Sequence, residues 1–200
     1  HCMRWAVKTP DSAQPHFDRA LRQLEAWTSL KLDTVPSLVL VNCAEMEVLS
    51  EDLRKTDTPV SIRGLYSRQI TTTRQIRFGI TQKTETDVEE HIYIVDHLHD
   101  AVFRTAVMHE LMHDMLQEHF PRLEEAPLWV QEGICQQAAA EYCRRRNYAD
   151  ILYVIDHCTD PDYGDGYRYI KKIAGFDGWS ALRRWMETVD VAALPEKAPK

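Results

Sequence analysis

The stretch HELMHDML, residues 109–116, limits what this chain can fold into more than any other stretch. Residues four apart on an α-helix share one face, so a helix here aims the His109 and His113 imidazoles at one point. Glu110 lies beside that point without having to join it. This order and spacing are typical of helices that bind zinc and hold a general base next to it. The alternative is a helix whose histidines have ordinary hydrogen-bond partners.

A catalytic zinc site needs a third protein ligand, and the next predicted helix offers Glu132. The eighteen residues between His113 and Glu132 allow that helix to fold back on the first. Glu132 stands in the apolar run LWVQEGI, where burying a carboxylate is costly unless it is paired or bound to metal. The alternative is a solvated acid at a helix start. Gln136, one turn later, can orient a ligand histidine or be a plain surface amide.

Residue periodicity predicts an α+β domain whose strands lie in the first half. Apolar residues at helical spacing predict α-helices over 15–30, 44–55, 100–118, 127–146, 148–158, 166–174 and 178–189. We expect Asp100 to cap the helix that carries HELMH, and Pro127 to open the following one. Strand-forming residues predict one strand at 38–41, two or three strands within 59–80 and one at 92–95, with an acidic turn at 85–90.

Length and composition favour a single compact domain. Of the 200 residues, we expect 16–190 to form the body, 1–15 to be a linker or the remnant of an upstream zinc module, and 191–200 to be a loose tail. The net charge of −7 comes without a basic stripe, so neither nucleic acid nor an anionic membrane is an expected partner. No apolar run approaches the roughly 18 residues of a membrane span.

The cysteines and the first residues favour the cytoplasm. The five cysteines are odd in number and have no disulfide-like spacing, so we expect reduced thiols. The first residues, HCMRW, show no signal-peptide pattern. Cys135 falls in a helical pattern and is expected to be a buried free thiol and not a nucleophile.

Four short motifs, taken together in order, resemble a known peptidase family. They are Arg63-Gly64-Leu65, HELMH, the run Glu132 to Gln136 (EGICQ) and the turn Tyr163 to Gly166 (YGDG). This order resembles the gluzincin peptidases and, more closely, the DA-one family, the ubiquitin-activated LIM-domain peptidases of plants and their bacterial relatives. The resemblance covers roughly residues 16–188. It departs at Asp114, where family members often have a small or aromatic residue after the second histidine.

The resemblance implies a zincin-like fold, in which a mixed sheet packs on the active-site helix and the second half is helical. It implies a zinc metallopeptidase that hydrolyses peptide bonds of protein substrates. His109, His113 and Glu132 would hold Zn²⁺, and Glu110 would take a proton from water as general base. The expected partner is a protein or peptide substrate, and the family adds ubiquitin or a ubiquitinated protein.

The resemblance also implies a donor for the oxyanion. In gluzincin aminopeptidases this donor is a tyrosine followed three residues later by glycine, at the start of a helix after the Glu-Gly helix. Tyr163 and Gly166 reproduce that spacing. A phenol donates a hydrogen bond without carrying charge at neutral pH. Tyr167 is the alternative donor but is expected to pack in the core, and a turn residue on the surface is the alternative for Tyr163.

Two questions stay open at this point. A catalytically silent or latent zinc-containing module that binds a protein partner such as ubiquitin would carry the same ligands, although a structural site has no use for Glu110. The strand at 92–95 is either a sheet edge along which an extended substrate pairs or an interior strand. For His97 and His99, which form an HxH pair, we expect surface or capping roles.

Overall fold

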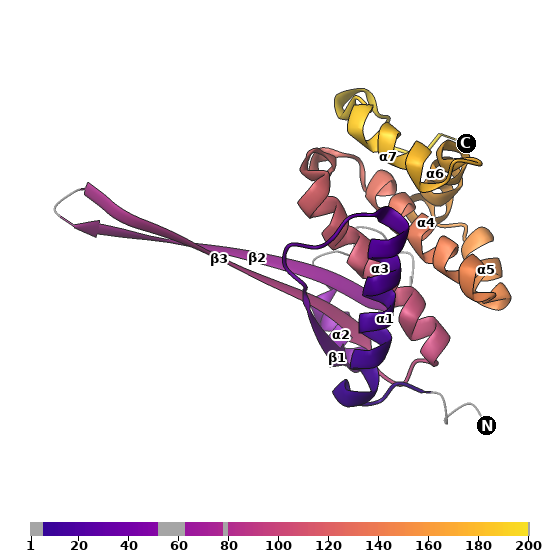
Figure 1. Cartoon of the computed structure of the whole chain (residues 1–200), viewed down its shortest axis with the longest axis horizontal. Helices are drawn as coiled ribbons and strands as arrows, with labels where there is room; N and C mark the ends of the chain where they lie inside the picture. The colour runs from indigo at the N-terminus through magenta and orange to yellow at the C-terminus, as the bar shows by residue number, and fades with distance from the viewer. Residues whose placement is uncertain (1–5, 52–62, 78–79, 200) are drawn as a thin grey trace.

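The chain has the predicted α+β architecture. A computed structural model describes residues 6–51, 63–77 and 80–199, without the side chains of 72–87. Within these residues there are seven α-helices and one three-stranded mixed sheet. The sheet belongs to the first half of the chain, and everything from residue 100 onward is helical or connects helices (Figure 1).

The sheet has the strand order β1-β3-β2. β1 (Ser37–Val41) runs parallel to the last residues of β3 (Ile80–Val95). β2 (Gly64–Arg77) runs antiparallel to β3 over its whole length, beginning with Gly64 opposite Ile94. The far parts of β2 and β3 leave the helical body as a long two-stranded ribbon (Figure 1).

Two strand predictions differ from the structure. The sequence predicts two or three strands within 59–80, but the described part of this segment forms the single strand β2 and the first residue of β3. Residues 59–62 and 78–79 lie outside the described residues. The acidic turn predicted at 85–90 is wrong, because these residues belong to β3 and pair with β2. Cross-strand pairing overrides the low strand propensity of Glu and Asp, which a single-chain pattern cannot anticipate.

The strand predicted at 92–95 exists, but it is not a sheet edge. Its residues pair with β1 on one side and with the first residues of β2 on the other. Of the two alternatives for this strand, the interior strand is therefore the correct one, and the hypothesis that an extended substrate pairs with it fails. Among the described residues β1 and β2 are the two edge strands, each with one unpaired side, and β2 packs against α3.

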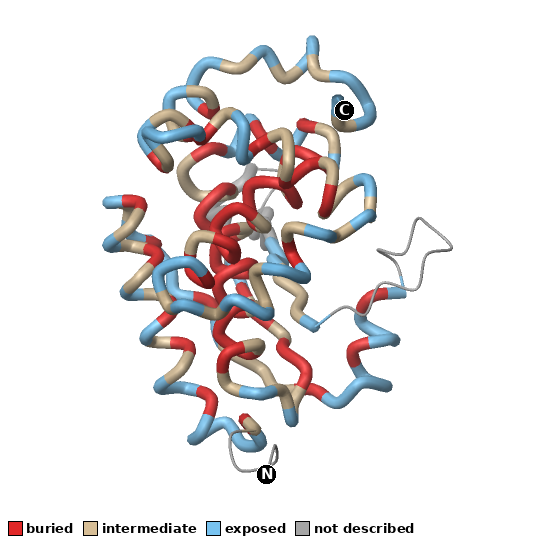
Figure 2. The backbone as a smooth tube through the Cα atoms, turned by 90° about the vertical axis from the view of Figure 1, so that its right-hand side faces the viewer, coloured by how far each residue is buried: buried red, intermediate tan, exposed pale blue. Residues whose placement is uncertain are grey.

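The helix that carries HELMH is the centre of the fold. α3 (Asp100–His119) contacts α1, both long strands and α4 (Leu128–Arg146). It has apolar residues around its whole circumference, which is typical of a helix buried on every side. The buried residues run through the middle of the molecule, and exposed ones lie at its outside (Figure 2). The cap of α3 is His99 and not Asp100, because the His99 ring accepts from the Ala101 N–H at 3.3 Å.

The N-terminal helix is longer than predicted. α1 (Pro10–Thr28) begins five residues before the expected start, with Thr9 as its N-cap. Val7 and Ala13 are buried in the core, so the described residues before 16 pack as part of the same unit. His1 and Cys2 lie outside the described residues. α2 (Cys43–Leu49) is shorter than predicted, and 52–55 are not described either.

The second half closes the core from the other side. Its remaining helical segments are η3 (Pro121–Glu125), α5 (Ala149–Asp156), the π-helical turn η4 (Pro161–Asp165), α6 (Gly166–Ala174), α7 (Trp179–Thr188) and η5 (Val191–Ala193). The tail is not loose as expected, since Leu194 packs on the core and the Trp129 indole donates to the Pro195 carbonyl at 2.8 Å. None of the described helices has the length and apolarity needed to cross a membrane.

Candidate metal centre

Two neighbouring helices bring three potential metal ligands together. His109 and His113 come from α3, and their Nε2 atoms lie 3.3 Å apart. Glu132 comes from the second turn of α4, and its Oε2 lies 3.1 Å from His109 Nε2 and 3.6 Å from His113 Nε2. Glu132 is buried, so it is not the solvated helix-start acid that was the alternative for this residue.

The spacing of these three atoms fits zinc. Zinc binds histidine nitrogen and carboxylate oxygen at about 2.0–2.2 Å with tetrahedral geometry, which separates neighbouring ligand atoms by about 3.3–3.6 Å. The three observed separations are 3.1, 3.3 and 3.6 Å. Two of these separations lie in the range expected for zinc and the third is slightly shorter, so the spacing of His109 Nε2, His113 Nε2 and Glu132 Oε2 is compatible with a single zinc ion.

Gln136 leaves the His109 lone pair free to bind metal. The other ring nitrogen of His109, Nδ1, lies 3.1 Å from Gln136 Oε1. An amide oxygen only accepts, so Nδ1 carries the hydrogen and Nε2 of the neutral ring keeps its lone pair toward the cluster. Gln136 therefore makes the contact with His109 that one of its two sequence alternatives requires.

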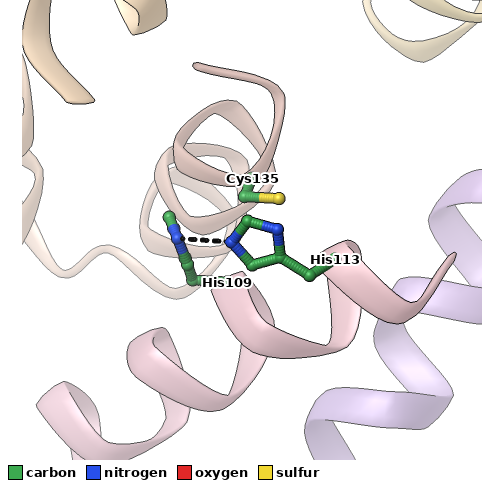
Figure 3. Close-up of side chains that lie close together, drawn as sticks. All are labelled: His109, His113 and Cys135. Atoms are coloured by element: carbon green, nitrogen blue, oxygen red, sulfur yellow. Dashed lines mark hydrogen bonds between the residues drawn. The ribbon is translucent and has the colours of Figure 1, made fainter. Parts of the chain in front are cut away.

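Cys135 is a fourth group at this centre, so two sets of three ligands are possible. His109, His113 and Cys135 each offer one ligand atom within 4.8 Å of the others, and the Cys135 sulfur lies beside the His113 ring (Figure 3). Burial raises the pKa of the Cys135 thiol to about 11, so it stays protonated in the absence of a metal. The ligand set with Glu132 has separations of 3.1–3.6 Å and an ionised carboxylate, so we take His109, His113 and Glu132 as the candidate ligands, with Cys135 as the alternative third ligand.

Without a metal, electrostatics favours the charged form of the His113–Glu132 pair, in which His113 carries a proton that a bound metal would displace. Burial alone would lower the pKa of His113, but the neighbouring Cys135 and Glu132 raise it well above its usual value. Burial alone would likewise raise the pKa of Glu132, but His113 and His109 hold it below its usual range. A carboxylate that stays ionised in a buried place is suited to binding a cation.

Glu110 is buried beside the three ligands but is not one of the converging groups. Burial raises the pKa of its carboxyl, while the two histidines act in the opposite direction. Its carboxylate accepts a hydrogen bond from the backbone N–H of Tyr66 in β2. It also touches Gly64, where an added Cβ would lie 2.5 Å from Glu110 Oε1. The start of β2 therefore holds this carboxylate in place.

The predicted oxyanion donor lies at the same centre. The Tyr163 ring stacks against His109 with 5.9 Å between ring centroids and 21° between planes. Burial raises the pKa of Tyr163, and the nearby Glu132 and Glu110 carboxylates add to this, so the phenol keeps its proton. Tyr163 is half-buried with its ring against His109, so it is not a turn residue whose ring lies free on the surface.

The other candidate residues lie away from the centre. Tyr167 packs in the core as predicted, and its hydroxyl donates to Asp156 Oδ1 at 2.8 Å. His99 caps α3, and the His97 ring pairs with Asp96 at 3.0 Å, so the HxH pair has the expected capping and surface roles. A surface hollow of about 1010 Å³ between α1, α4, α6 and α7 contains none of the residues of the centre.

The three candidate ligands are mostly but not completely buried. The side chains of His113, His109 and Glu132 keep 18, 11 and 9% of their surface exposed. The ligand atoms are thus largely shielded from water, which strengthens electrostatic interactions, but the site is not sealed.

Comparison of the chain with protein-family models, with curated proteins and with solved structures found no match. The assignment of a function therefore depends on the residues of the centre. Sequence reasoning found six of them, His109, Glu110, His113, Glu132, Gln136 and Tyr163, and missed the contacts of Gly64, Tyr66 and Cys135. The only sequence signal for Gly64 was its place in the Arg-Gly-Leu motif.

Proposed function

We propose that this protein is a zinc-dependent metallopeptidase of gluzincin type that hydrolyses peptide bonds of protein or peptide substrates, with a zincin-like fold similar to that of the DA-one peptidases. The observation that carries the proposal is the position of Glu110. A buried carboxylate stands next to three converging ligand atoms without joining them. A structural zinc site has no use for such a group, whereas hydrolysis needs a general base there.

The roles of the residues follow from their positions. His109, His113 and Glu132 would hold Zn²⁺, which when bound supplies a Lewis acid that acidifies water and polarises a carbonyl. Glu110 accepts a proton from the attacking water and passes it to the leaving amine, and its raised pKa suits both steps. Tyr163, which stays protonated, donates a hydrogen bond to the oxygen that becomes negative during attack.

The corrected sheet topology supports a different placement for the substrate. In the described residues β1 and β2 are the two edge strands of the sheet, and Gly64 and Tyr66 at the start of β2 contact Glu110. Unpaired backbone groups of an edge strand can pair with an extended peptide. A substrate along the first residues of β2 would bring a peptide bond to the side of the centre that holds Glu110.

The proposal is tested by comparing zinc content and peptidase activity in two variants. Glu110→Gln is expected to keep zinc and fold but to lose about 10²- to 10⁴-fold in rate, because it lacks the base. His113→Ala is expected to lose both zinc and activity, because it lacks a ligand. Elemental analysis and turnover of an unfolded protein substrate measure the two effects separately.

Two controls test which residue is the third ligand and whether the protein is a peptidase or a zinc-containing binding module. Cys135→Ser is expected to keep zinc, while Glu132→Ala loses it; the reverse pattern would assign the third ligand to Cys135. If the wild type binds zinc but has no activity above Glu110→Gln on any substrate, the protein is a silent zinc-containing module. If it takes up no zinc at all, the whole proposal is refuted.

A further inference from the structure

A second cluster of ligand atoms lies on another side of α3. Glu90 from β3 and Asp114 and Glu118 from α3 each offer one carboxylate oxygen, and these oxygens lie within 4.8 Å of one another. Asp114 is fully buried and the Glu90 side chain is 2% exposed. Burying two carboxylates side by side is costly unless positive charge or hydrogen bonds compensate them.

The neighbours of this cluster supply too few hydrogens. The Tyr66 hydroxyl has one hydrogen but three acceptors, at 3.1 Å (Glu90), 3.0 Å (Asp114) and 3.4 Å (Gln117). Arg68 brings one positive charge, with its Nε 3.1 Å from Glu90 Oε1. The second oxygens, Glu90 Oε2 and Asp114 Oδ2, are buried and have no hydrogen-bond partner among the described residues.

We propose that Glu90, Asp114 and Glu118 form a second metal site, which binds a hard divalent cation such as Ca²⁺. The two buried oxygens without partners are the observation that points to a ligand, because each has a lone pair facing no donor. Three carboxylates against one guanidinium leave an excess negative charge that a divalent ion neutralises.

The donor set separates this site from the zinc centre. All its ligand atoms are oxygens, which Ca²⁺ and Mg²⁺ prefer, whereas zinc prefers the imidazole nitrogens of the first centre. Separations of up to 4.8 Å between ligand oxygens also fit Ca²⁺, whose bonds are about 2.3–2.6 Å long. Gln117 Oε1 and water can supply further oxygens, since Ca²⁺ takes six to eight.

The site would act on the stability of the fold. Glu90 belongs to the central strand, and Asp114 and Glu118 belong to the central helix, so one ion would tie the sheet to α3. The Glu118 carboxylate also accepts from the backbone N–H groups of Asp33 and Thr34, at 2.7 and 3.1 Å, and thereby links the loop before β1. The ion would thus join three segments that are far apart in the sequence.

The test is a titration of Ca²⁺, and separately of Mg²⁺, into the full chain. The protein is saturated with Zn²⁺ beforehand, so that binding at the histidine centre does not contribute to the signal. We expect one ion per chain in calorimetry. We expect the melting temperature to rise by about 5–10 °C when the cation is at about a hundred times its dissociation constant. Asp114→Asn and Glu90→Gln are expected to abolish both effects.

The stability of Asp114→Asn separates loss of a cation ligand from a general loss of structure. Without added cation it should fold and melt no lower than the wild type, because it removes a buried negative charge and its amide can donate to Glu90. Asp150→Asn makes the same change at an exposed position of α5 and should keep cation binding. His113→Ala should also keep it, so failure of the zinc proposal would not affect this one.

Two outcomes overturn the inference. The first is that neither cation binds at concentrations up to about 10 mM, which is above the dissociation constants of even weak calcium-binding modules. This result would mean that a proton, and not a metal ion, neutralises the carboxylate pair. The second is binding that survives both Asp114→Asn and Glu90→Gln, which would place the ion elsewhere.

Discussion

Gly64 is the residue at which the sheet comes closest to the proposed base. An added Cβ there would lie 2.5 Å from Glu110 Oε1, 2.8 Å from Glu110 Cγ and 2.9 Å from Ile94 Cδ1. No unstrained side chain is that close to its neighbours, so any other residue has to displace Glu110 or the strand. A glycine is needed here for lack of space and not for an unusual backbone angle.

Gly64→Ala is therefore expected to destabilise the protein by about 1–3 kcal/mol, as overpacking of a core does. It should also lower peptidase activity while zinc is retained, because the Glu110 carboxylate moves and the ligands do not. Urea unfolding and zinc analysis measure the two effects. Arg63→Ala, one residue earlier and exposed, should change neither. Unchanged stability and activity in Gly64→Ala would show that the strand does not position Glu110.

Asp156 gives a pH-dependent contribution to stability. Burial alone would raise the pKa of its carboxyl, but hydrogen bonds from Lys171 and Tyr167 outweigh this and hold the pKa below its usual value. A lowered pKa in the folded state means that the stabilisation is complete above the unfolded pKa of about 3.9 and is lost as the pH falls through the folded value.

Asp156→Asn is expected to cost about 1 kcal/mol at pH 7, the usual range for a partly buried hydrogen-bonded carboxylate. The difference from the wild type should shrink below about pH 4, because the wild-type carboxyl is then protonated too. Chemical unfolding at pH 7 and at about pH 3 measures it. The exposed Asp150→Asn is the matched control, and a difference that stays constant with pH would contradict the assignment.

At the scale of elements, the π-helical turn η4 places Tyr163 over the metal centre. Asp160 caps this turn and accepts from the backbone N–H groups of Asp162 and Tyr163, both at 2.9 Å. The helix that follows packs so closely on α4 that a Cβ on Gly133 would lie 2.6 Å from the Gly166 carbonyl carbon. Because Gly133 follows Glu132 directly, one close contact sets the position of Tyr163 relative to a ligand.

Tyr163→Phe is expected to keep zinc and fold and to reduce the rate by roughly 10²- to 10³-fold, the effect of losing one oxyanion donor. Turnover at saturating substrate measures this. Tyr167→Phe makes the same change four residues later and should keep the rate but lower stability, because it removes the hydrogen bond to Asp156. Equal rates in wild type and Tyr163→Phe would remove Tyr163 from the mechanism.

At the scale of the whole molecule, the two proposed metal sites tie the central helix to its surroundings. The first joins α3 to α4, and the second joins α3 to β3. Helix α3 also contacts α1 and the sheet through a continuous apolar core, so its packing does not depend on metal alone. Loss of zinc should therefore weaken the fold without unfolding it.

Removal of zinc with a chelator is expected to lower the melting temperature by about 10 °C. The reference is the same protein in the presence of free zinc at about a thousand times the dissociation constant. Restoring zinc should restore the melting temperature. His113→Ala, which lacks a ligand, should show no response to chelator or zinc. A chelator effect that persists in this variant would locate the stabilising ion outside the histidine centre.

The sequence alone determined the local features of this protein. Helical spacing put His109 and His113 on one face, and the length of the connecting segment let Glu132 return to them, because both follow from chain geometry over short distances. The α+β class and the approximate helix positions followed from apolar periodicity for the same reason. Gln136 could be suspected because it stands one turn from Glu132.

Only the tertiary structure decided which strand is central, where β2 meets Glu110, and that Asp114 lies against Glu90. These contacts join residues up to some fifty positions apart, and no local pattern carries their register. The acidic residues at 85–90 indicated a turn by composition, yet pairing with β2 made them part of a strand. Burial of Asp114 is likewise invisible in the sequence, because the cost of burying a charge depends on neighbours that only the folded chain supplies.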